Sequence, residues 1–267
     1  MRTAAPVPTP APSPATVLSP MLERLAAERA TGALMRDCGT LYLADGEVVH
    51  AESPATPGID VLLTRGGTLH RDGWWDAVAR AGAHRRVGRY LVDSGRVAGG
   101  ALELCHLGVL YDAAFFALAP TRTPARFRYG VAHWIGPVRP VPVDAVQRET
   151  LRRRELLDRI WPEAAGDSAP LVRTGSPVDG PVPPRQQRVL ECVDGVRTAT
   201  DIAQELGRSA FHTLVDLRRL TAAGLVEAVR QPTGPAASAT ARIELPEITP
   251  DPDVALLRRL RDALEAL

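Results

Sequence analysis

The sequence predicts an α+β protein in two parts: a small antiparallel sheet with helices and, after a linker, three short helices with a β-hairpin. Three observations predict it. An Asp-Gly pair lies between two β-prone runs, helical periodicity follows, and a segment containing several Pro, Gly and Ser then precedes a second helical region. The expected parts are a disordered Pro- and Ala-rich lead (1–16), an α+β unit (17–161), a linker (162–183), a three-helix and hairpin unit (184–245) and an amphipathic helix (252–267).

The first helix is expected to begin at Ser19 and Pro20, because serine is a preferred N-cap and proline fits the first helical position. Apolar residues then recur at helical spacing until a Thr-Gly pair, and a strand follows at 33–36. Next, Asp45-Gly46 predicts a tight hairpin between the β-prone runs on either side, since both central residues of such a turn need a positive φ.

Beyond the hairpin, periodicity predicts mainly helices. The expected segments are helices at 59–63, 73–81, 87–94 and 101–119, a strand at 127–131 and an amphipathic helix at 143–160. Of Trp74 and Trp75, one is expected in the core and the other partly exposed. The stretch 101–119 is the most apolar, but Glu103 and Asp112 favour a buried core helix over a membrane span, because two carboxylates are too costly in lipid.

The overall charge and the residue types present exclude several functions. The chain has 32 basic and 31 acidic residues and a net charge of +1, so no global field draws it to nucleic acid or to an anionic membrane. It contains no lysine and no asparagine, a bias towards GC-rich codons that predicts a bacterial source. Without lysine there is no P-loop lysine, no kinase-type lysine and no Schiff base.

The other reactive side chains form no recognisable motif. The six histidines show no metal-binding spacing, and Ser94 lacks the glycine two places earlier that a nucleophile elbow needs. Cys38, Cys105 and Cys192 lie far apart, as is typical of free thiols in a reducing compartment, and residues 1–16 lack the features of a signal peptide. We therefore expect a cytoplasmic, non-enzymatic protein without a cofactor or a metal ion.

The second part has the order of a winged helix, which is three helices followed by a β-hairpin. The helices are expected at 184–193, at 198–206 after a capping box, and at 209–223. The segments 225–230 and 241–245 are expected to pair as the wing. If this unit binds DNA, its third helix enters the major groove. The candidate DNA-binding residues are then Arg208, Ser209, His212, Thr213, Arg218 and Arg219.

Helical spacing places His212, Asp216 and Arg219 on the exposed face of this third helix, with Thr213 and Arg218 at its edges. Residues 184–230 hold seven arginines and six carboxylates, and Asp216 lies in the middle of that face. DNA binding by counterion release needs several uncompensated cations. Docking of a protein, or dimerisation, is therefore the alternative use of this unit.

Four stretches of the first part, taken in order, resemble a PATAN-type domain, a bacterial regulatory domain. They are the first helix with Thr31-Gly32-Ala33-Leu34, the hairpin over 41–51, the segment 87–97, and Phe127-Arg128-Tyr129 leading to Arg153-Arg154-Glu155. The second part resembles a MarR-like winged helix. The first resemblance implies a non-catalytic module of two-component and small-GTPase-linked signalling proteins, although the sequence shows no receiver domain with its phosphoacceptor aspartates.

Two functions fit these features. The first is a transcriptional regulator-like protein in which a sensory or docking domain passes a signal through the winged helix to duplex DNA. The alternative is a signalling adaptor whose winged helix and terminal helix (252–267) bind protein partners, as in a small GTPase or roadblock-type system. A protein partner is expected through the N-terminal domain or the terminal helix, a homodimer is a further option, and no membrane contact is expected.

Overall fold

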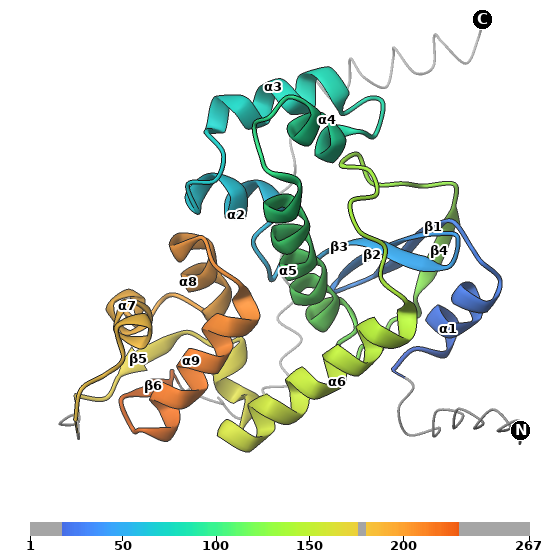
Figure 1. Cartoon of the computed structure of the whole chain (residues 1–267). Helices are drawn as coiled ribbons and strands as arrows, with labels where there is room; N and C mark the ends of the chain where they lie inside the picture. Colours follow the sequence, from blue (N-terminus) through green and yellow to red (C-terminus); the bar gives the residue numbers. More distant parts are fainter. Residues whose placement is uncertain (1–17, 176–179, 230–267) are drawn as a thin grey trace, which may run out of the picture. The chain divides into compact units, whose positions relative to one another are not determined.

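A four-stranded antiparallel sheet organises the first part of the protein, with the strand order β3-β2-β1-β4 (Figure 1). In this computed structural model, residues 18–175 and 180–229 are described. The strands are β1 (Gly32–Arg36), β2 (Gly39–Ala44), β3 (Glu47–Glu52) and β4 (Arg126–Tyr129). Helices combined with this small antiparallel sheet confirm the predicted α+β class. The predicted lead and the predicted terminal helix lie outside the described residues.

The hairpin between β2 and β3 turns at Asp45 and Gly46, as predicted. Their φ angles are 53° and 83°, so both central residues adopt the positive values that the turn requires. Further along the hairpin, the register shifts between Tyr42 and Leu43. Because of this shift His50 pairs directly with Tyr42, and directly opposed residues of two strands have their side chains on the same face.

The sheet packs against helices that surround one hydrophobic core. These are α1 (Pro20–Ala27), α5 (Gly99–Ala117) and α6 (Val143–Ile160). The hydroxyl of Ser19 caps α1 by accepting a hydrogen bond from the amide of Leu22, as expected of an N-cap. By length and composition α5 could cross a membrane, but it packs on β2 and β3 and carries the buried Asp112. Its contacts are those of the core helix that the sequence predicts.

A second core lies among three short helices that follow the sheet. They are α2 (Ile59–Arg65), α3 (Arg71–Ala81) and α4 (Val87–Asp93), close to the predicted bounds. Trp74 is buried in this core and Trp75 is 58% exposed, which confirms the expected division between the two indoles. The rings of Trp74 and Trp134 form a T-shaped contact at a centroid distance of 5.6 Å.

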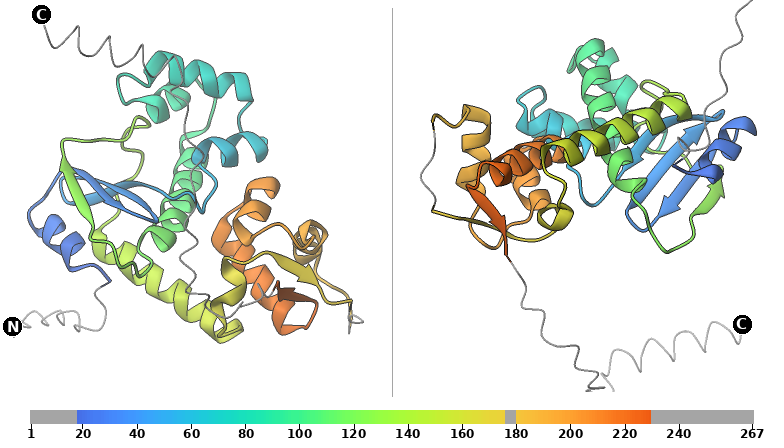
Figure 2. Two further views of the ribbon diagram at one scale, coloured as in Figure 1. Left: turned by 180° about the vertical axis from the view of Figure 1, so that it is seen from behind. Right: turned by 90° about the horizontal axis from the view of Figure 1, so that it is seen from below.

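The third core contains the C-terminal helices. They are α7 (Pro184–Cys192), α8 (Ala199–Leu206) and α9 (Ala210–Ala222), and the predicted capping box is present at Thr198 and Asp201. Helix α6 runs from the first core to this one (Figure 2). Its residues Val143 and Val146 belong to the sheet core, whereas Leu157 belongs to the core that contains α9. The three-helix unit is therefore in direct contact with helices of the α+β unit.

The segment predicted as a linker contains regular structure, which corrects that prediction. A 3₁₀ helix η2 (Ala164–Asp167) and a strand β5 (Leu171–Arg173) lie within it. Strand β5 pairs antiparallel with β6 (Val226–Ala228). In the chain, β5 precedes α7 and β6 follows α9, so the two strands enclose the three helices in sequence. Leu171 of β5 and Val226 of β6 are both buried in the third core, so this segment contributes to the packing of the three-helix unit. The strand predicted at 241–245 as the other half of a wing lies outside the described residues.

Candidate functional site

The start of α9 is bound by a carboxylate from the α+β unit. Asp112, within α5, is 1% exposed and accepts three hydrogen bonds from the beginning of α9. The donors are the hydroxyl of Ser209 (2.9 Å) and the amides of Ala210 (2.7 Å) and Phe211 (2.9 Å). The first amides of a helix have no intrahelical acceptor and carry the positive end of the helix dipole, so they bind carboxylates well. Asp112 thus caps α9 from outside its own segment.

Arg153 of α6 completes this contact. Its guanidinium lies 3.6 Å from Asp112 and 2.9 Å from Glu149, and its central carbon lies 4.6 Å from the centroid of the Phe211 ring. Burial raises the pKa of Asp112, while its hydrogen-bond donors on α9 and the charge of Arg153 favour the ionised carboxylate and oppose that rise. We call this set of residues the α5–α9 junction: Asp112, Arg153, Ser209, Ala210 and Phe211.

The residues predicted to bind DNA lie in different surroundings. Ser209 belongs to the α5–α9 junction, and Thr213 is fully buried with its hydroxyl donating to the carbonyl of Ser209 (3.0 Å). Arg218 is buried too, paired with Asp167 (2.9 Å) and donating to the carbonyl of Trp161. The prediction that Thr213 and Arg218 lie at the edges of an open face is therefore wrong. His212 and Arg219 are exposed, as predicted.

Asp216 is also buried rather than exposed. It is 1% exposed and binds the guanidinium groups of Arg185 on α7 (2.8 Å) and Arg208 (2.6 Å). The helical spacing predicted an exposed Asp216, and this is wrong because α9 is covered from several sides. It contacts α7 and α8 as well as α5, α6 and η2. A helix surrounded in this way has no wide polar face, and Asp216 serves as the counterion of two arginines.

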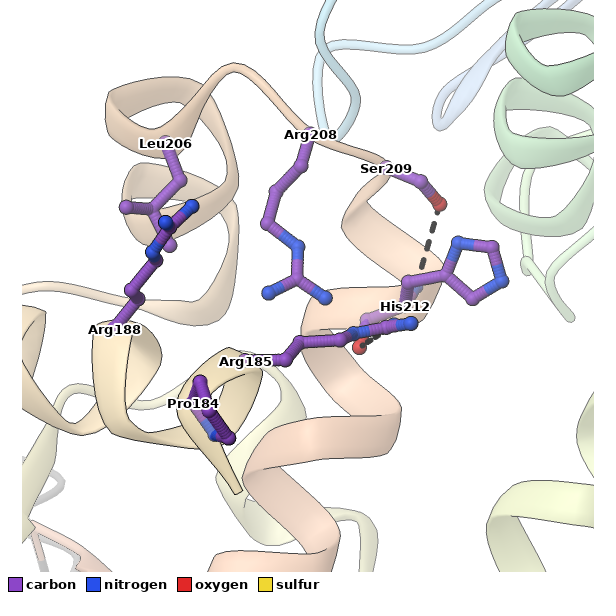
Figure 3. A pocket seen from close by; sticks show the side chains of 7 residues that line it. All are labelled: Pro184, Arg185, Arg188, Leu206, Arg208, Ser209 and His212. Atoms are coloured by element: carbon purple, nitrogen blue, oxygen red, sulfur yellow. Dashed lines mark hydrogen bonds between the residues drawn. The ribbon is translucent and has the colours of Figure 1, made fainter. Parts of the chain in front are cut away.

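A cavity of about 480 Å³ lies beside the start of α9, between α7 and the turn after α8 (Figure 3). Its lining contains three arginines, Arg185, Arg188 and Arg208, together with His212. Both Arg185 and Arg208 are paired with the same carboxylate, Asp216. Positive charge therefore exceeds negative charge around this cavity, and an anionic group is the chemistry that it suits.

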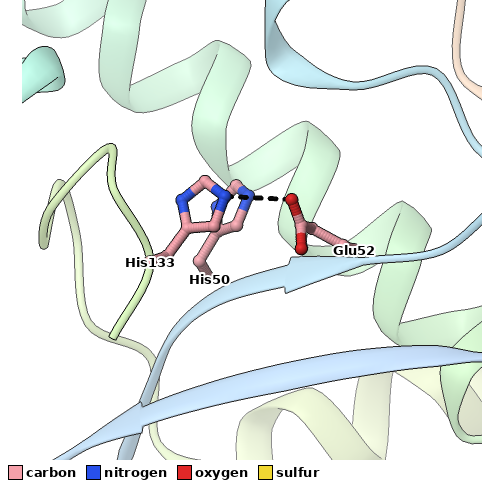
Figure 4. Close-up of side chains that lie close together, drawn as sticks. All are labelled: His50, Glu52 and His133. Carbon is pink, nitrogen blue, oxygen red and sulfur yellow. Dashed lines mark hydrogen bonds and ion pairs between the residues drawn. The ribbon is translucent and has the colours of Figure 1, made fainter. Parts of the chain in front are cut away.

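Three of the six histidines gather beside the sheet, which the spacing in the sequence did not indicate. The ring of His50 stacks on that of His133 at a centroid distance of 4.0 Å, and His106 of α5 follows at 5.3 Å from His50. The Nε2 of His133 lies 2.9 Å from one oxygen of Glu52, and the hydroxyl of Tyr42 donates to the other (2.8 Å). We call His50, His106, His133, Glu52 and Tyr42 the histidine cluster, of which Figure 4 shows His50, Glu52 and His133.

The surroundings of two of these histidines, His50 and His106, favour the neutral imidazole. Burial holds the pKa of His50 well below its usual value, with smaller contributions from the neighbouring histidines, and burial lowers the pKa of His106 to about 4. The hydrogen bond from His133 lowers the pKa of Glu52. At neutral pH His50 and His106 are therefore uncharged, next to an ionised carboxylate, and each has a nitrogen lone pair.

Comparison of the chain with protein-family models, with characterised proteins and with solved structures gives no match. The assignment of a function therefore depends on the two sites described above, the α5–α9 junction and the histidine cluster.

Proposed function

We propose that this protein is a non-enzymatic adaptor of a bacterial signalling system, in which the α+β unit controls the three-helix unit and a protein partner receives the output. The observation that carries the proposal is the α5–α9 junction. In a winged-helix or helix-turn-helix protein the N-terminal part of the recognition helix meets the base edges of DNA. Here that part of α9 donates its hydrogen bonds to Asp112.

The charges on α9 support the same proposal. Of its two arginines, Arg218 is buried against Asp167, which leaves Arg219 as the exposed one. The affinity of a protein for duplex DNA depends on how many phosphate charges it neutralises with free cations. A helix with one exposed arginine contributes little to such binding. The PATAN-type regulatory domain that four stretches of the first part resemble in sequence would also fit an adaptor.

A DNA-binding regulator is the second candidate, and the arginine-lined cavity favours it. Arg185, Arg188 and Arg208 surround the start of α9, where a phosphate could bind. In this alternative Asp112 competes with phosphate for the amides of Ala210 and Phe211, and the α5–α9 junction opens before DNA binds.

The two candidates differ in a titration of the purified full-length protein with a labelled random duplex, followed by fluorescence anisotropy. For the adaptor we expect no binding at micromolar protein even at about 50 mM salt, where electrostatic binding is strong. Binding that weakens with salt and is lost in the double variant Arg185→Ala/Arg188→Ala would overturn the adaptor proposal. The double variant Arg71→Ala/Arg122→Ala, which removes two other exposed arginines, is the matched control.

The protein output is tested by affinity capture from the host with and without nuclease. We expect a partner that is recovered in a fixed ratio to the bait and that persists after nuclease treatment. Recovery of DNA-associated proteins alone, all lost after the nuclease, would count against the adaptor.

A further inference from the structure

The histidine cluster brings three metal-ligand side chains to one point. His50 and Glu52 lie two residues apart on β3, which places them on the same face of the strand, and His133 reaches them from the chain between β4 and α6 (Figure 4). Each offers a donor atom, and the three donor atoms lie within 4.8 Å of one another. The imidazoles are buried, whereas Glu52 is about half exposed and gives the group access to solvent.

Two nitrogens of this cluster lack a partner. The Nδ1 atoms of His50 and His106 are buried and have no hydrogen bond within the described part of the chain. Buried polar atoms are bonded in the great majority of cases, and an unbonded one is costly. His50 is the one of these two histidines that lies with Glu52 and His133 in a group of possible metal ligands. A bound electrophile in the cluster would account for at least the nitrogen of His50.

We propose that His50, Glu52 and His133 bind one divalent transition-metal ion, and that zinc fits the site best. Two imidazole nitrogens and one carboxylate oxygen are a ligand set that zinc takes in proteins, with a fourth position left for water. Magnesium and calcium prefer oxygen ligands throughout, so they suit this set poorly. The proposal does not depend on the adaptor function, since it uses no residue of the α5–α9 junction.

The surroundings of Glu52 resemble those of a metal-binding carboxylate. The hydroxyl of Tyr42 donates to the second oxygen of Glu52, which fixes the carboxyl group and leaves the first oxygen facing His133. Hydrogen bonds of this kind orient the groups that bind a metal, and their loss typically weakens binding about 10- to 100-fold. Tyr42 is accordingly a positioning residue for the site.

Binding requires a small local change. Zinc–nitrogen bonds of about 2 Å hold their donor atoms closer together than 4.8 Å, so the side chains must approach one another. The Nδ1 of His133 accepts a 3.3 Å hydrogen bond from the amide of Ile135, and a nitrogen that accepts carries no proton, so the ring proton that faces Glu52 is on Nε2. Binding through Nε2 moves that proton to Nδ1 and gives up the bond from Ile135.

The test is zinc binding to the full-length protein after removal of metal with a chelator. Zn²⁺ is titrated in competition with a chromogenic chelator, and Co²⁺ is added separately to record its visible absorption. We expect one ion per chain, a Co²⁺ spectrum of low coordination number, and a higher midpoint of thermal unfolding with Zn²⁺. Mg²⁺ at the same concentration should leave that midpoint unchanged.

Four variants connect the ion to these residues. Glu52→Gln and His133→Gln should each weaken zinc binding at least tenfold, and Tyr42→Phe should weaken it about tenfold. His84→Gln, which removes an exposed histidine outside the cluster, should bind like the original protein. Because Glu52 is half exposed, Glu52→Gln should keep the circular dichroism spectrum of the original. Zinc binding that is absent, or that is unchanged in both Glu52→Gln and His133→Gln, would overturn the proposal.

Discussion

The carboxylate of Asp112 on α5 accepts a 2.7 Å hydrogen bond from the amide of Ala210, the first residue of α9. This contact joins residues 98 positions apart and is buried. It ties the longest helix of the α+β unit to the helix that would read DNA in a winged-helix protein. Whatever alters the position of α5 therefore acts directly on the start of α9.

Asp112→Asn should loosen this contact. The asparagine side chain carries no negative charge. Its NH2 group is a donor in place of one acceptor oxygen, so it meets the backbone amides of α9, which are donors themselves. We expect the free energy of unfolding to fall by about 1–3 kcal/mol, the usual cost of leaving a buried polar group unsatisfied. Urea denaturation measures that loss, and hydrogen exchange should show faster exchange at the amides of Ala210 and Phe211.

The control for this prediction is Glu103→Gln, on the same helix. Glu103 forms a surface ion pair with Arg139, and such pairs contribute little to stability. If Asp112→Asn were as stable as Glu103→Gln, with unchanged exchange at α9, the α5–α9 junction would not hold α9 in place.

Asp216→Asn should change the charge of the arginine-lined cavity. The substitution removes the buried counterion shared by Arg185 and Arg208, so both guanidinium groups become available to an anion. We expect the variant to elute from a heparin column at a higher salt concentration than the original protein, because more uncompensated cations give stronger, salt-dependent binding.

Asp144→Asn makes the same change of charge at the surface of α6, where Asp144 pairs with Arg148. It is the matched control for Asp216→Asn and should raise the elution salt much less. Equal shifts in the two variants would mean that heparin responds to net charge alone and that the cavity is not a preferred anion site.

Features that are determined by neighbouring residues could be predicted from the sequence. Asp45-Gly46 defines its turn because few other pairs tolerate two positive φ angles, and Ser19 and Thr198 cap helices that begin within three residues of them. The sequence also predicted that one of Trp74 and Trp75 is buried and the other partly exposed, but it did not show which one belongs in the core. The turn and the two caps depend on interactions within a few residues, whereas Trp74 packs against Trp134, which is distant in the sequence.

The candidate sites could not be predicted in this way, because their residues are distant in the sequence. Glu52 and His133 are 81 positions apart, and Asp112 and Phe211 are 99 apart. One signal was present in the sequence: a carboxylate among the apolar residues of α5 needs a buried partner. That signal favoured a core helix over a membrane span, but it did not reveal that α9 provides the partner or that α9 is covered on several sides.

Gly46→Ala should be among the most damaging single-methyl additions in the hairpin. A Cβ atom at this position would lie 2.6 Å from the carbonyl oxygen of Ala26, and the φ of 83° is already unfavourable for alanine. We expect a loss of at least about 2 kcal/mol in the free energy of unfolding, from backbone strain and the collision together. Thermal or urea denaturation measures it.

Gly95→Ala separates the two causes. Gly95 also has a positive φ, of 69°, but a Cβ atom there would meet nothing within 4 Å. Its substitution should therefore lower the free energy of unfolding only through backbone strain, by about 1 kcal/mol. A Gly46→Ala variant that lost no more than Gly95→Ala would show that the hairpin and α1 can move apart without cost.

Cys105 should be an unreactive thiol in the folded protein. Burial raises its pKa to about 11, and the thiolate is the form that reacts with alkylating agents. At pH 8 its alkylation by iodoacetamide should be roughly 100-fold slower than that of an ordinary cysteine, and the rate should rise about tenfold per pH unit up to about pH 11. Peptide mass spectrometry of time points gives the rate at Cys105, and the same reaction in urea gives its unfolded value.

The folded thiol keeps its proton to a higher pH than the unfolded thiol, so alkaline pH should also reduce the free energy of unfolding. Equal rates in buffer and urea at pH 8 would contradict the prediction, because they would mean that the packing of Cys105 beside the second core does not protect its thiol.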